Sequence, residues 1–123
     1  MYQYVLQVPT TPVRPNEQLT LTWEPRLAPQ PSADVFEIQL CVALFGPWGS
    51  VEALKKSAPH DTKACPPTGA IATSSTLHTV SASGARLAAE ITVPSAPGFY
   101  DLRQISVYGA GNSMSGGAVI EVR

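Results

Sequence analysis

The stretch from Ala85 to Arg123, ARLAAEITVPSAPGFYDLRQISVYGAGNSMSGGAVIEVR, contains the clearest structural pattern in the chain. Segments 85–93, 99–108 and 118–123 alternate apolar and polar side chains, and turn-forming residues separate them. Such alternation is typical of half-buried strands, because successive side chains of a strand point to opposite faces. The stretch therefore predicts two or three antiparallel strands, with a hairpin loop in the Gly/Asn/Ser tract over 109–117.

Weaker or shorter patterns upstream predict further strands at 2–8, 18–23, 34–45, 70–73 and 77–82. Two of these segments place their large apolar side chains on a single face, which we expect to be buried. The expected core residues are Leu19, Leu21, Trp23, Phe36, Ile38, Leu40, Val42 and Leu44. The segment Gly46-Pro47-Trp48-Gly49 is expected to end the central strand, and Ser50 to cap a helical turn over 51–56.

These elements predict an all-β fold: an immunoglobulin-like antiparallel β-sandwich of seven to nine strands with at most one short helix. The length of 123 residues suits one domain, over 1–123. Because strands are expected at both ends of the chain, we interpret it as the N-terminal part of a longer protein.

The charge balance limits the classes of partner. Eight Lys and Arg residues are offset by nine Asp and Glu residues, for a formal net charge of −1. Phosphate binding needs clustered positive charge, so we expect no nucleic-acid partner. No apolar run approaches the roughly 20 residues that cross a bilayer, so no transmembrane segment is predicted.

The two cysteines leave two interpretations open. Cys41 lies inside an apolar strand and Cys65 in a polar loop, and a bond between them is geometrically possible. We expect a buried free thiol and a loop thiol, which fits a cytoplasmic location. A disulfide between Cys41 and Cys65 would instead indicate an extracellular protein.

A family resemblance rests on four segments in order: LTLTW at 19–23, ADVFEI at 33–38, PGFYDLR at 97–103 and GGAVIEV at 116–122. Tyr100 in the third also has the form of a tyrosine corner, in which the hydroxyl bonds back to the preceding backbone. The order of these segments resembles a SKICH domain, and fibronectin-type and other immunoglobulin-like domains are similar as well.

The resemblance implies an immunoglobulin-like module of the kind that precedes coiled coils in autophagy adaptors or accompanies inositol phosphatase domains. The chain departs from that pattern in two places. Val35 stands where the family usually has Trp after Asp, and Glu37 replaces a glycine.

Two sets of residues superficially suggest chemistry. They are His60, Asp61 and Cys65 in one loop, and Ser74, Ser75, Ser81 and His78 nearby. The first set is too small for a zinc site, which needs four ligands with paired spacings. In the second, no serine lies on a Gly-x-Ser-x-Gly turn. We therefore expect no catalytic residues, no metal and no cofactor.

Trp48 is the strongest candidate for binding. A large aromatic at a strand end either covers the core or anchors a partner, and Trp23 already provides the aromatic between the sheets. Phe45 precedes it, and Lys55, Lys56 and Lys63 could form a small basic patch for an anionic headgroup or an acidic partner.

We expect a non-enzymatic protein-interaction module of a larger scaffold or adaptor protein. Its partner and oligomeric state are left open by the sequence. The alternative is a secreted or cell-surface carbohydrate-binding or adhesion domain, and a third reading is an accessory domain of an enzyme.

Overall fold

A computed structural model of the protein describes residues 2–9, 12–27, 35–58, 64–109 and 112–123. In these residues the chain forms eight strands and one short helix. They are β1 (Tyr2–Gln7), β2 (Gln18–Leu27), β3 (Glu37–Trp48), α1 (Val51–Ser57), β4 (Ala72–Thr73), β5 (Leu77–Val80), β6 (Leu87–Thr92), β7 (Gly98–Tyr108) and β8 (Asn112–Val122).

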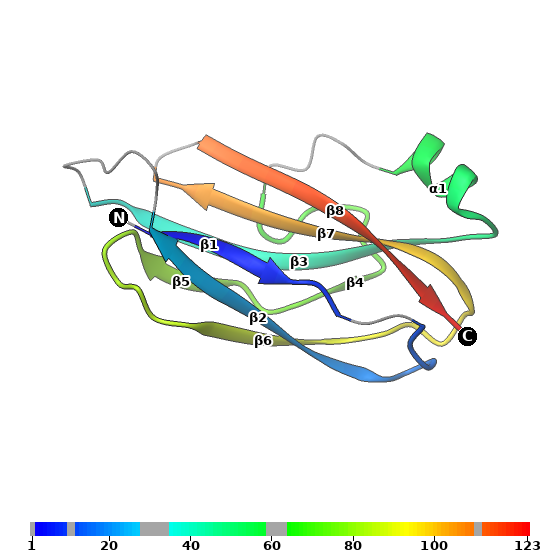
Figure 1. The fold of residues 1–123 in the computed structure, drawn as a ribbon. Helices are drawn as coiled ribbons and strands as arrows, with labels where there is room; N and C mark the ends of the chain where they lie inside the picture. The colour runs from blue at the N-terminus through cyan, green and yellow to red at the C-terminus, as the bar shows by residue number, and fades with distance from the viewer. Residues whose placement is uncertain (1, 10–11, 28–34, 59–63, 110–111) are drawn as a thin grey trace.

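The strands form two antiparallel sheets (Figure 1). One sheet has the order β1-β2-β6, and the other has the order β4-β3-β7-β8, with β5 also paired to β3. Apolar side chains from both sheets meet in one core. The predicted all-β sandwich with a single short helix is therefore confirmed.

The core contains nearly all the residues that alternation placed there. Leu21, Trp23, Leu40 and Val42 are fully buried, and the other predicted core residues of β2 and β3 are buried with them. Phe36 is the exception, because it lies just before the first residue of β3 and is only half-buried. Its ring meets the edge of Tyr108, with the ring centroids 6.1 Å apart.

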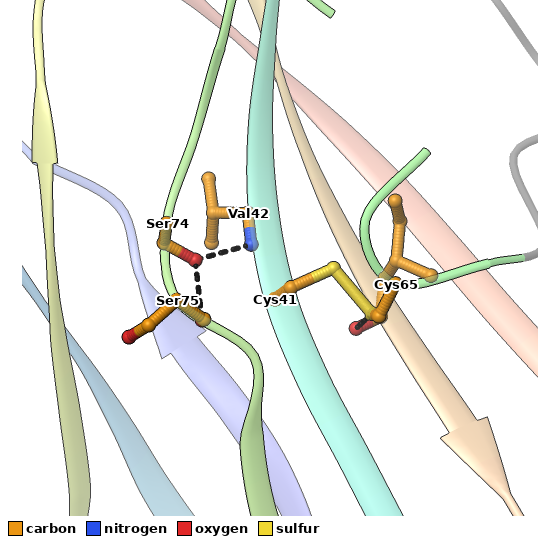
Figure 2. Close-up of a disulfide and its surroundings, with 6 residues drawn as sticks. Cys41, Val42, Cys65, Ser74 and Ser75 are labelled. Atoms are coloured by element: carbon orange, nitrogen blue, oxygen red, sulfur yellow. Dashed lines mark hydrogen bonds between the residues drawn. A yellow bond between two sulfur atoms is a disulfide. The ribbon is translucent and has the colours of Figure 1, made fainter. Parts of the chain in front are cut away.

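The middle of the opposite face of β3 is also buried, since α1 and the segment that carries Cys65 lie against it. Ala43 and Cys41 are inaccessible on this face. Cys41 and Cys65 form a disulfide, with their Cα atoms 5.8 Å apart (Figure 2). The expectation of two free thiols is therefore wrong, and the cytoplasmic location that rested on it has no support. The two cysteines meet because the chain returns over β3 after α1.

The end of β3 differs from expectation. The segment Gly46-Pro47-Trp48 does not end the strand: after a shift of register beyond Phe45, Trp48 pairs with Phe99 of β7. Gly46 has a φ of +131°, and a side chain there would lie 3.0 Å from the carbonyl oxygen of Phe99. Glycine thus lets β3 bend and continue.

β8 is also longer than predicted, because the Gly/Ser tract is mostly strand and not loop. Pairing between β7 and β8 is unbroken from Tyr108↔Asn112 to Gly98↔Val122. A side chain at Gly117 would come within 2.6 Å of Asp101 Oδ1 and 2.8 Å of Arg103 Nη2. Gly117 therefore leaves room for the side chains of Asp101 and Arg103 on β7, which is a reason for glycine that local sequence does not reveal.

The predicted tyrosine corner is present. The hydroxyl of Tyr100, at the start of β7, donates a hydrogen bond of 2.6 Å to the carbonyl oxygen of Ala96. The ring is fully buried. Burial raises the pKa of the Tyr100 phenol above its ordinary value near 10, because the phenolate would lose its hydration.

Replacing Tyr100 with phenylalanine is expected to lower the free energy of unfolding by about 1 kcal/mol at pH 7, because the bond to Ala96 is lost. Above pH 10 the unfolded wild-type chain loses the phenol proton before the folded chain does, so the wild type should lose stability as pH rises. Tyr100→Phe should lack this part of the loss. Urea unfolding at pH 7, 10 and 11 measures both effects, and identical pH slopes for the two proteins would contradict the assignment.

Candidate functional site

An open hollow lies at the end of β3, with an internal volume of about 420 Å³. We call it the Trp48 corner, and its lining residues are Phe45, Gly46, Pro47, Trp48, Ser57 and Gly69. Trp48 is half-buried there, whereas Phe45 is only 8% exposed and forms part of the support beneath it. Aromatic and proline side chains line the corner together with the hydroxyl-bearing Ser57 and two glycines, so it offers apolar and polar surface in comparable amounts.

The elements around the corner are held in place by local interactions. The hydroxyl of Ser50 accepts a hydrogen bond from the Ala53 backbone N–H at 3.1 Å, which confirms the predicted cap of α1. Leu54 is 3% exposed and attaches the helix to the sheet. The last residue of α1, Ser57, is thereby brought to the hollow next to Trp48. Trp48 thus lies between a strand pair and a capped helix.

The predicted binding residues do not all meet at this corner. Trp48 and Phe45 line it, but Lys55 lines a separate hollow of about 310 Å³, together with Asp101, Arg103 and Gly117. Lys56 is exposed on α1 and lines neither hollow. Lys55 and Lys56, two of the three lysines of the expected basic patch, are therefore not part of the Trp48 corner.

A buried ion pair forms the floor of the second hollow, and sequence reasoning missed it. Arg103 Nε donates to Asp101 Oδ2 at 3.1 Å, and Arg103 Nη2 donates to Asp101 Oδ1 at 3.3 Å. Both side chains are nine-tenths buried or more. The available signal was their spacing of two on one strand, which places both on the same face. The opposite charges compensate each other, so neither side chain is left as an unpaired buried charge.

The residues that suggested chemistry have other roles. The hydroxyl of Ser74 accepts from the Val42 N–H at 2.9 Å and donates to the Ser75 carbonyl at 3.0 Å, which fastens this segment to β3 (Figure 2). Ser81 accepts from the Phe36 N–H at 3.1 Å. Cys65 is in the disulfide, while His60, Asp61 and Lys63 lie outside the described residues.

Within the described ranges, no group of three or more His, Cys, Asp and Glu side chains is placed to hold a metal ion. The helix in this part of the chain is too short to cross a membrane.

Comparison with known proteins adds no family to this picture. No model of a known protein family matches the chain, and a search of curated proteins finds no similar sequence. The function must therefore be inferred from the site itself.

Proposed function

We propose that the protein is a non-enzymatic interaction domain of a larger scaffold or adaptor, and that it binds a protein partner through the Trp48 corner. The observation that carries the proposal is the position of Trp48, half-buried beside an open hollow that offers both apolar and polar surface. Tryptophan is enriched among the residues that dominate the binding energy of interfaces, particularly where a pocket adjoins it.

The rigidity of the corner supports this role. Trp48 pairs with Phe99 in the ladder between β3 and β7, and Ser50, the N-cap of α1, follows two residues later. A partner would therefore meet a preformed surface, and little conformational entropy would be lost on binding.

The Cys41–Cys65 disulfide supports placing this domain in an oxidising compartment, at the cell surface or outside the cell. Disulfides persist in such compartments and are rare in the cytosol. The partner is then best sought among secreted and surface proteins. The resemblance to SKICH domains supports only the interaction role and not this location, because the adaptor proteins that contain SKICH domains act inside cells.

Replacing Trp48 with alanine is expected to weaken binding by about 2 kcal/mol or more, roughly 30-fold in Kd, while the unfolding midpoint hardly changes. Partners captured from the surface and secreted fractions of the source cells would be identified, purified and titrated against each variant by calorimetry. A loss of several kcal/mol of stability in Trp48→Ala would show that the indole belongs to the core and not to an interface.

Val80→Ala is the matched control for that titration. Val80 is an apolar residue that is 40% exposed and pairs with Glu37, at the other end of β3 from Trp48. Its truncation should leave both the Kd and the unfolding midpoint unchanged. Equal losses of affinity in the two variants would place the partner elsewhere.

A carbohydrate-binding or adhesion domain is the second candidate, and the disulfide favours it because such domains act outside the cell. Binding to an array of glycans separates the two candidates. Glycan binding that Trp48→Ala abolishes would favour the second candidate over a protein partner.

A further inference from the structure

The outer edge of β8 is a second surface, away from the Trp48 corner. β8 is the last strand in the order β4-β3-β7-β8, so only one of its two edges is paired in that sheet (Figure 1). Among the described residues, the pairing on its other edge is a single parallel bridge between Val13 and Val122. The part of this edge from Ser113 to Gly117 is a candidate for strand addition.

The bonds of Val13 show which backbone groups point outward. The Val13 N–H donates to the Glu121 carbonyl at 2.9 Å, and the Arg123 N–H donates to the Val13 carbonyl at 3.0 Å. In an antiparallel ladder, alternate residues direct both backbone groups away from the partner strand. Because the register with β7 is unbroken, Ser113, Ser115 and Gly117 direct their N–H and C=O groups to the same outer side as Glu121.

The edge lacks the usual protection against pairing. Natural edges are commonly blocked by lysine, proline, bulges or inward charges. From Asn112 to Ile120, β8 contains no charged residue and no proline, and its register shows no bulge. At the far end of the strand the chain itself already adds a short extended segment, at Val13.

A small groove adjoins the open part of the edge. Its volume is about 140 Å³, and its lining includes Tyr4 of β1, Tyr108 of β7 and Met114 of β8. Met114 lies an even number of residues before core residue Ile120, so the two side chains are on the same face of β8. Met114 is nevertheless 64% exposed. A cavity of about 150 Å³ holds benzene, so the groove fits one ring-sized apolar side chain.

We propose that this edge binds an extended peptide, which adds a strand beside Ser113, Ser115 and Gly117 and places an apolar or aromatic side chain in the groove. An extended backbone is the ligand that satisfies alternating N–H and C=O groups at strand spacing. The uncharged lining selects for a peptide without charges in this stretch.

The first test selects ten-residue random peptides, displayed on phage, against the whole chain. Enriched peptides are synthesised with capped ends, and Kd is measured with wild type, Ser115→Pro and Ser115→Ala. Proline removes the outward N–H without touching the ladder to β7, so binding should weaken about tenfold or more. Ser115→Ala keeps the N–H and should bind within about twofold of wild type.

Amide hydrogen exchange on the wild type provides a test that does not depend on how Ser115→Pro folds. The amides of Ser113, Ser115 and Gly117 should exchange quickly in the free protein and slowly with an enriched peptide bound. The amides of Gly116 and Ala118 point toward β7 and should be slow in both states.

Four outcomes would overturn the proposal. They are the enrichment of no peptide, equal binding by wild type and Ser115→Pro, loss of binding in Trp48→Ala, and outward amides already protected in a dimer of the free chain. The third would place the peptide at the Trp48 corner, and the fourth would make a second copy the occupant of the edge.

Discussion

Replacing Leu40 with alanine is expected to lower the free energy of unfolding by about 2–5 kcal/mol. Leu40 lies in the middle of β3, is fully buried, and is flanked by Leu77 of β5 and Ser106 of β7. Truncation removes apolar contacts from both sheets and leaves a cavity that strands paired on both sides cannot close. Urea unfolding followed by circular dichroism gives the loss as a shift of midpoint at constant slope.

Leu27→Ala is the matched control for Leu40→Ala. Leu27 is the last residue of β2 and is 72% exposed, so the same truncation should change stability by no more than about 0.5 kcal/mol. A loss below about 1 kcal/mol in Leu40→Ala would mean that this face of β3 does not form the core.

Reduction of the Cys41–Cys65 disulfide is expected to lower the free energy of unfolding by about 3 to 4 kcal/mol. The bond spans 24 residues of sequence and fastens the segment after α1 to the centre of the larger sheet. In the chain-entropy account, breaking the disulfide increases the conformational entropy of the unfolded chain more than that of the folded chain. Urea unfolding with and without dithiothreitol measures the loss.

The Cys65→Ser variant is the control for the reductant. It should be less stable than wild type by a similar amount, and dithiothreitol should not change it further. Thiol titration of the unreduced, denatured wild type should find no free thiol. Two titratable thiols in that experiment would contradict the disulfide and remove the support for an extracellular location.

Local pattern predicted most of the strands because alternation is a property of neighbouring residues. The core face of β2 and β3 follows from side chains two positions apart, and the cap of α1 follows from Ser50 and the run after it. Where the prediction of a strand's extent failed, a glycine was ambiguous. Gly117 looks like a turn residue in sequence, but it pairs with Arg103 in a strand.

The candidate site was only partly predictable for the same reason. Trp48 and Phe45 are close in sequence, so their meeting at one corner needs no long-range information. Lys55 is almost as close, yet α1 turns it toward the hollow above Asp101 and Arg103. The direction in which a helix residue faces depends on the sheet surface against which the helix packs. The sequence of the helix alone does not specify that surface.

By itself, the sequence determined the fold class, the strands with clear alternation, the buried face of β3 and the tyrosine corner, since each depends on residues within a few positions of one another. The tertiary structure alone decided that Cys41 meets Cys65, that Asp101 and Arg103 form a buried pair beneath Gly117, and that the edge of β8 is open beside Met114. These features depend on how separate segments pack against one another: the disulfide joins cysteines 24 residues apart, and the ion pair lies beneath Gly117 of the neighbouring strand. Sheet order and the packing of the helix and loops on the sheet decide such contacts. Periodicity along the chain bears on the register of a strand pair, but it does not specify which strands are neighbours.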